Sequence, residues 1–180
     1  TDDGPAADVN PDGLAVDASH DREFSIAACW ADEEFAHAEE VWASGDEAAT
    51  LQWVIARAGR RIPVVIDSMS PAASLIPRLK SAGVDVHTGT AGDMAKACGM
   101  WLGEVVADRL THGNQPSVNT ALMAATQRDI GTAGGWGWDR RDHTNIAPLV
   151  AHSLARLAAS LKRKPSGRGR SSSGRRMVVG

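Results

Sequence analysis

The chain has 180 residues, enough for one domain with its own hydrophobic core and too few for two complete domains of ordinary size. Apolar residues make up 43% of it and charged residues 23%, as in an ordinary globular protein. No apolar run approaches the ~20 residues of a membrane span, and the first residues lack the basic start and apolar core of a secretory signal. We therefore expect a cytosolic protein without a membrane partner.

The two cysteines argue against two further classes of protein. Cys29 and Cys98 both lie in apolar segments, and neither has a second cysteine or a histidine at metal-ligand spacing. A structural zinc site and a disulfide framework are therefore not expected.

The net charge of −3 conceals a strong asymmetry along the chain. Seven of the 19 basic side chains fall in the last 19 residues, which contain no acid, so the first 161 residues carry 12 basic and 22 acidic side chains. A basic tail of this kind can attract phosphate, and bound metal ions could neutralise some carboxylates of the acidic body, which together would permit a nucleic-acid partner. A solvated tail without a partner is the equal alternative.

Composition divides the chain into three parts. Residues 1–12 are rich in Asp, Pro, Gly and Ala, which is typical of a linker that enters a domain from upstream. Residues 162–180 begin with KRKPSGRGRSSSGRR, which offers nothing apolar to bury and indicates a disordered basic tail. The folded domain should span residues 13–161.

Hydrophobic periodicity predicts three strands, a helix, and then alternating strands and helices. Ser44 and Glu47 have the spacing of a capping box before the first helix, and Gly59 should end that helix. Pro77 should kink the second helix, whereas Pro148 is tolerated in the first turn of the last one. In chain order we expect strands at residues 14–17, 24–30 and 36–41, a helix at 46–58, a strand at 62–67, a helix at 70–83, a strand at 84–87, helices at 93–109 and 117–126, a hairpin at 131–139, and a last helix from 145.

Two of the predicted strands end in a carboxylate, Asp17 and Asp67. The strand at residues 62–67 has no polar side chain before its terminal Asp, as expected for a central strand covered on both faces. Side chains at strand ends converge where open α/β sheets bind ligands, so these two carboxylates could hold Mg²⁺ or Mn²⁺. Two such ions would activate water and stabilise the leaving oxygen in phosphodiester cleavage. The plain alternative is that each Asp only ends its strand or caps a turn.

The order of the elements resembles the RNase H-like superfamily, and several strings are similar to the nuclease half of phage large terminases. The resemblance covers residues 13–160 and implies a three-layer α/β fold, with a mixed central sheet and helices on both faces. The strings that carry it are VVIDSMSPAA at residues 64–73, MAKACG at 94–99, LTH at 110–112, WDRR at 138–141 and IAPLVA at 146–151.

By this resemblance Asp17 and Asp67 are the first two metal-binding carboxylates, and a third should stand at the start of the last helix. This sequence has Asn145 there, where family members commonly have Asp, and an Asn oxygen ligates a hard cation without adding charge. Asp142 is an alternative third ligand, and Asn145 is also a good helix N-cap. The expected site has Asp17, Asp67 and Asp142 as catalytic carboxylates, with Asn145 as a further ligand of two Mg²⁺ or Mn²⁺ ions.

Aromatic and imidazole side chains near the site have two interpretations each. Trp136 and Trp138 alternate with glycine and could stack on bases, although core packing is the better supported role. His20 lies near Asp17 in sequence and His143 near the last helix, but no motif supports catalysis by either. A surface or hydrogen-bonded histidine is the favoured interpretation for both.

Double-stranded DNA is the substrate that the resemblance implies. Arg140 and Arg141 suit contacts with its phosphates, although a solvated turn is the equal alternative. The sequence has no GxxxxGK[ST] motif, so the ATPase that drives packaging should belong to a preceding domain. The resemblance also implies the small terminase subunit and the portal as partners, in the host cytoplasm and transiently at the procapsid.

Three functions are consistent with these observations. The leading hypothesis is a metal-dependent endodeoxyribonuclease that cuts concatemeric viral DNA during genome packaging, with little sequence preference because carboxylates read phosphate geometry. The alternative is a catalytically degenerate RNase H-like module that binds DNA or the portal without cutting. The third is a small-molecule-binding α/β domain unrelated to nucleic acid.

Overall fold

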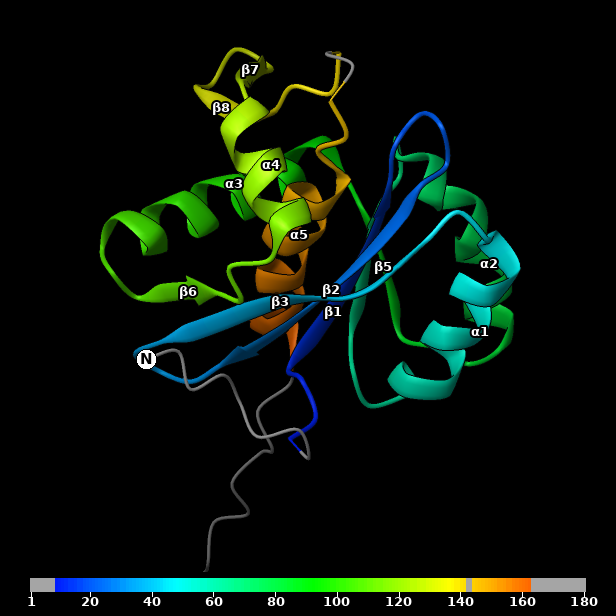
Figure 1. Cartoon of the computed structure of the whole chain (residues 1–180). Coiled ribbons are helices and arrows are strands. Elements are labelled where there is room, and N and C mark those ends of the chain that lie inside the picture. The colour runs from blue at the N-terminus through cyan, green and yellow to red at the C-terminus, as the bar shows by residue number, and fades with distance from the viewer. Residues whose placement is uncertain (1–8, 142–143, 163–180) are drawn as a thin grey trace, which may run out of the picture.

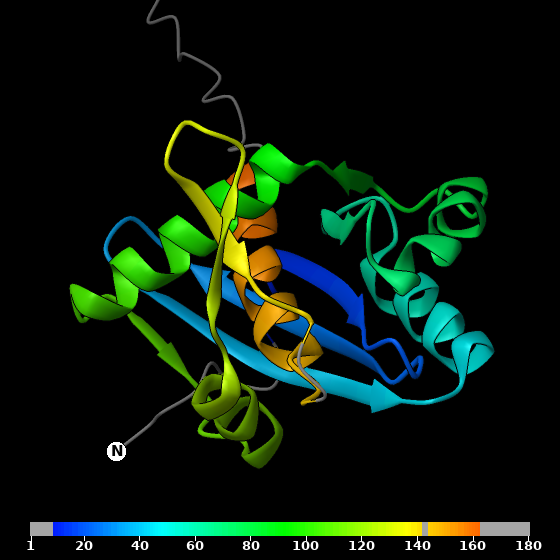
Figure 2. The same ribbon diagram turned by 90° about the horizontal axis from the view of Figure 1, so that it is seen from above.

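One mixed sheet of six strands forms the centre of the domain (Figures 1 and 2). The computed structural model describes residues 9–141 and 144–162. In their order across the sheet, the strands are β5 (Val86–Gly89), β4 (Val64–Asp67), β1 (Gly13–Ala18), β2 (Phe24–Ala31), β3 (Ala36–Ser44) and β6 (Leu110–His112). β1, β2 and β3 are antiparallel neighbours, whereas the pairs β1–β4, β4–β5 and β3–β6 are parallel.

Helices pack on both faces of this sheet, as Figure 1 shows. Alternate residues of β1 face opposite layers: Ala15 lies in the core beneath α3 and α5, while Leu14 and Val16 lie in the core beneath α1 and α2. The predicted three-layer fold is therefore confirmed. One layer comprises α1 (Glu47–Ala58), the 3₁₀ helix η1 (Pro71–Leu75) and α2 (Ile76–Ser81). The other layer comprises α3 (Ala91–Val106), α4 (Pro116–Ala124) and α5 (Ala147–Leu161). A hairpin of β7 (Gln127–Ile130) and β8 (Gly135–Trp138) packs against α3.

The helix α5 lies across β1 and β2 and is buried along most of its length. Pro148 occupies its first turn, as predicted, where a missing amide hydrogen removes no intrahelical bond. Among the described residues, no helix combines the length and apolarity needed to cross a lipid bilayer.

The first helix begins with a different cap from the one predicted. β3 continues through Ser44, so Ser44 is a strand residue, and its hydroxyl accepts a hydrogen bond from the amide of Asp46 at 3.0 Å. Asp46 is the N-cap, with its carboxylate accepting from the amide of Ala49 at 3.0 Å. Strand pairing with β2 thus moved the cap two residues along the chain. A capping box does occur at α3, formed by Thr90 and Asp93.

Other boundaries differ for local reasons. Pro77 does not kink one helix but stands in the first turn of α2, which follows η1 directly. β5 lies two residues later than predicted. β6 was not predicted as a strand, because three residues with one buried side chain, Leu110, give no usable periodicity. Parts of the predicted linker and basic tail, residues 1–8 and 163–180, lie outside the described residues.

Close packing of β1 against α5 gives a stability prediction. An added Cβ at Gly13 would overlap the backbone of Ala158 and Ala159, which cannot move without shifting α5. Gly13→Ala should therefore lower the free energy of unfolding by about 1–3 kcal/mol. Gly99 in α3 has nothing within 4 Å of an added Cβ, so Gly99→Ala should raise it by about 0.5–1 kcal/mol. Urea unfolding of both variants checks the pair, and equal effects would contradict the packing.

His152 of α5 gives a pH prediction. Its side chain is buried, Nδ1–H donates to the carbonyl of Pro148 at 2.7 Å, and Nε2 has no hydrogen-bond partner among the described residues. Burial lowers the pKa of His152 from 6.5 to about 4, against the raising effect of the bond to Pro148. As pH falls below 6.5, His152 becomes protonated in the unfolded chain, whereas in the folded protein it stays neutral until about pH 4.

Stability should therefore decline through that window by about 3 kcal/mol. His152→Leu keeps an apolar core residue without the imidazole, so its stability should be flatter between about pH 7 and about pH 4. Urea unfolding across this range compares the two proteins. Parallel curves for the two proteins would rule out His152 as the source of the decline.

Candidate active site

The two strand-terminal carboxylates lie side by side. β1 and β4 are parallel neighbours in which Ala15 pairs with Val65, so Asp17 and Asp67 follow two residues later on the same side of the sheet. Asp17 is 1% exposed and Asp67 8% exposed. The sequence pattern predicted this meeting because parallel strands end at one edge of a sheet.

One arginine bridges both carboxylates. Arg140, which follows β8, donates from Nη1 to Oδ1 of Asp17 at 2.8 Å and from Nη2 to Oδ2 of Asp67 at 3.2 Å. The Arg140 side chain is 21% exposed, so the three charges meet in a largely desolvated place. A guanidinium can satisfy two carboxylates at once because its donors form a planar fork.

Burial disfavours the ionised form of the Asp17 carboxyl. Burial raises its pKa above the usual value and the charge of Asp67 adds to the rise, while Arg140 and a hydrogen bond with Ser70 oppose it. Ser70 is itself held in place, because its hydroxyl accepts from the amides of Ala18 and Ala72 at 3.3 and 3.1 Å. A buried carboxylate with these neighbours is stabilised by any cation that reaches it.

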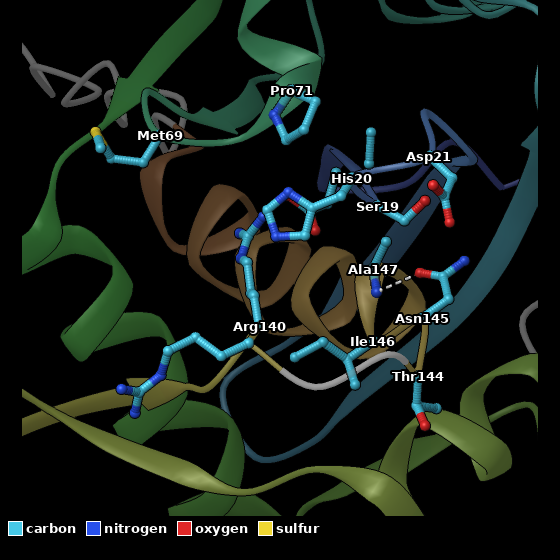
Figure 3. Close-up of a pocket in the computed structure, with 13 residues that line it drawn as sticks. Ser19, His20, Asp21, Met69, Pro71, Arg140, Thr144, Asn145, Ile146 and Ala147 are labelled. Carbon is cyan, nitrogen blue, oxygen red and sulfur yellow. Dashed lines mark hydrogen bonds and ion pairs between the residues drawn. The ribbon is translucent and has the colours of Figure 1, made fainter.

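Two pockets adjoin the carboxylates. Figure 3 shows the first, a cavity of about 330 Å³ whose walls come from the β1–β2 turn, the segment after β8 and the start of α5; Asp17 lines it. The second, about 470 Å³, is lined by Asp67 and Arg128. Arg140 lines both pockets, and so do His20, Met69 and Arg141. The guanidinium that binds the two carboxylates therefore lies where the pockets adjoin.

The predicted third ligand is placed in part. Asn145 lines the same pocket as Asp17, and its Oδ1 accepts from the amide of Ala147 at 2.9 Å, as Figure 3 shows. The helix itself begins at Ala147 with Ile146 as the N-cap residue, so the capping oxygen comes from one residue earlier. The alternative ligand Asp142, like His143, lies outside the described residues.

The remaining sequence candidates have local partners. Arg141 pairs with Asp139, two residues away, through bonds of 2.9 and 2.6 Å, and this pairing lowers the pKa of Asp139 to about 2. Trp138 is buried and its Nε1 donates to Ser153 at 2.9 Å, while Trp136 packs against its edge at 4.9 Å. Trp138 therefore packs in the core, and the alternative prediction that it stacks on bases is wrong.

Sequence reasoning missed Arg128 and Ser70 as site residues. Arg128 lies on β7 among exposed residues, and no pattern in the sequence connects it with Asp67. Ser70 was visible as the residue that opens a helix before Pro71, which it does as the N-cap of η1, but its bond with Asp17 depends on the distant strand β1. Within the described residues, no group of three or more His, Cys, Asp or Glu side chains is placed to hold a metal ion.

Comparisons with known proteins match this chain by its fold but not by its sequence. No family model and no curated protein matches the chain. Among solved structures, its fold is similar to that of phage large-terminase nuclease domains.

The particular structures are two of the large terminase nuclease of thermophilic phage G20c and one of the P22 large terminase nuclease domain. The first G20c structure has a TM-score of 0.60 at 10% identity, covering 81% of this chain and 80% of that one. The P22 domain has a TM-score of 0.56 at 9% identity, covering 83% and 81%. The second G20c structure, with bound magnesium, has a TM-score of 0.58 at 11% identity, covering 87% and 83%. At these identities the likeness is one of fold.

Proposed function

We propose that this domain is a metal-dependent endodeoxyribonuclease of a phage terminase large subunit, which cuts concatemeric double-stranded viral DNA during packaging. The observation that carries the proposal is the meeting of Asp17 and Asp67 at neighbouring strand ends, in a fold similar to that of terminase nucleases. Paired carboxylates on this edge of an α/β sheet suit phosphodiester hydrolysis.

The donor set fits a hard divalent cation. Asp17 and Asp67 offer carboxylate oxygens, the ligands that Mg²⁺ and Mn²⁺ prefer, and both already share one cationic partner in Arg140. These two residues would hold the ions, with Asn145 or Asp142 as the third ligand. When bound, two such ions supply an activated water and stabilise the leaving oxygen.

The chain's own residues prepare the site for a phosphodiester. Ser70 fixes the Asp17 carboxylate, and the amide of Met69 donates to Asp67 at 3.2 Å, so both are oriented without help from substrate. Arg128 and Arg141 line the pocket beside Asp67, where guanidinium groups suit phosphate oxygens. His20 lines both pockets, where an imidazole could take a proton from an attacking water or give one to a departing oxygen.

Partners follow from the same proposal. The ATPase that drives packaging would precede this domain, and the small terminase subunit and the portal would bind the assembled enzyme. The domain would then act in the host cytoplasm, and transiently at the procapsid portal. These assignments are supported by the likeness of fold to terminase nucleases.

A second function is favoured by one specific observation. Asn145 supplies an uncharged oxygen that is already bonded to Ala147, so fewer charges are available for a cation than three carboxylates would give. A degenerate module that binds DNA or the portal without cutting would have this character.

Plasmid nicking separates the two functions. With Mn²⁺ present, the wild-type domain should nick supercoiled plasmid, and Asp17→Asn and Asp67→Asn should each reduce the rate at least about 100-fold, since losing a direct ligand costs more than the 10–100-fold of an outer partner. Asp85→Asn removes an exposed carboxylate remote from both pockets and should nick normally. Wild-type protein that binds DNA but never nicks would favour the degenerate module.

Asn145→Asp tests the third ligand. An Asp keeps the oxygen that accepts from Ala147 and adds charge beside the Asp17 pocket, at the N-terminus of α5 where the helix dipole favours it. Mn²⁺ affinity, measured by calorimetry, should rise by roughly tenfold, equivalent to about 1.4 kcal/mol. Asn145→Ser retains a capping oxygen without charge and should leave the affinity near that of the wild type. Equal affinities in all three proteins would remove residue 145 from the site.

A further inference from the structure

The contact between Arg140 and the two carboxylates has the form of a competition. Each carboxylate gives one oxygen to the guanidinium, at 2.8 and 3.2 Å, in a place where few water molecules can share the charge. A divalent ion held by the same pair would need the same negative charge and would lie beside a guanidinium of like sign. The ion and the Arg140 contact therefore oppose each other.

We propose that Arg140 is a built-in competitor of the divalent ion, and that DNA phosphate, by drawing Arg140 from Asp17 and Asp67, makes metal binding and DNA binding mutually favourable. The inference rests on the proposed function, because it concerns the regulation of the same site. It assigns Arg140 two alternative partners, the carboxylates without DNA and a phosphate with it.

The surroundings of Arg140 permit this exchange. It lines both pockets, so a phosphate that enters the larger one reaches its guanidinium without passing through the core. Arg128 and Arg141 line that pocket together with Asp129 and Asp139, and Arg141 is paired with Asp139. The carboxylates keep anchors of their own when Arg140 leaves. Asp17 retains its bond with Ser70, and Asp67 retains the amide of Met69. The ligand pair is therefore held in place during the exchange.

Linkage then fixes the thermodynamic consequence. If DNA removes a competitor of the ion, bound ion must raise DNA affinity by the same factor. A domain built this way binds metal weakly until DNA is present, which limits premature loading of the site.

Calorimetric titration of MnCl₂ into the metal-free 180-residue chain tests the proposal. Arg140→Gln removes the competitor, so without DNA it should bind Mn²⁺ roughly tenfold more tightly than the wild type, within the usual range of coupling between sites. Arg141→Gln removes the same charge one residue away but leaves both contacts of Arg140 with the carboxylates, so its gain in Mn²⁺ affinity should be at most about twofold. Arg140→Lys keeps the charge without the bidentate fork and should fall between.

A phosphorothioate duplex, which resists hydrolysis, provides the second half of the test. Its addition should tighten Mn²⁺ binding to the wild type by a larger factor than to Arg140→Gln, because the variant has no guanidinium for the phosphate to draw away. Thermal melting gives a readout independent of cutting: in EDTA, Arg140→Gln should melt below the wild type, because two carboxylates lose their partner, and Mn²⁺ should raise its melting temperature more.

The outcomes separate this proposal from the one it rests on. Equal Mn²⁺ affinity in the wild type, Arg140→Gln and Arg140→Lys overturns the competition and leaves the nuclease in place. Absence of Mn²⁺ binding from every protein, with and without duplex, overturns the nuclease as well. Should Arg140→Gln fail to fold in EDTA, the comparison of Arg140→Lys with the wild type decides the question.

Discussion

Two carboxylates forced together out of water, with one guanidinium between them, are the constraint on which the rest of this domain depends. Asp17 and Asp67 each end a buried strand, and β4 lies beside β1, so their negative charges cannot separate. Arg140 reaches them from 123 residues beyond Asp17. A folded chain keeps such a cluster only where the charges are paired and where the scaffold is rigid enough to hold them against repulsion.

That rigidity comes from the helix layer that covers the same face of β1 as Asp17. α5 is buried along most of its length and lies on β1 so closely that Gly13 has no room for a side chain. This contact fixes β1 against α5, and at the start of α5 the Asn145 side chain accepts a hydrogen bond from the amide of Ala147. The site thus lies at one end of a closely packed pair of elements, and Trp138 ties the segment before Arg140 to α5 through Ser153.

The sequence predicts those parts of the structure that depend on local pattern and general rules of chain topology. The strand ending in Asp67 was evident because an apolar run ends in a charge, and its meeting with Asp17 follows from how parallel strands align. The sequence does not predict which interaction a residue makes when a local signal and a distant partner compete for it. Ser44 has the spacing of a helix cap, but it pairs in β3 instead. Arg140 suits a phosphate contact, but its guanidinium donates to carboxylates. Nothing in the local sequence ranks such competitors, because their energies depend on contacts formed only in the fold.

The charge of the chain bears on the proposed binding of DNA at this site. The described domain belongs to a segment with 12 basic and 22 acidic residues, so its long-range field repels DNA. With Arg140 alone, the carboxylate cluster is still net negative. Under the proposed competition, divalent ions on the same pair would reverse its sign and free Arg140 toward the pocket that Arg128, Arg141, Asp129 and Asp139 line. One binding event would then make a repulsive surface locally more attractive to phosphate. In the proposed nuclease, the metal would therefore serve substrate attraction as well as chemistry.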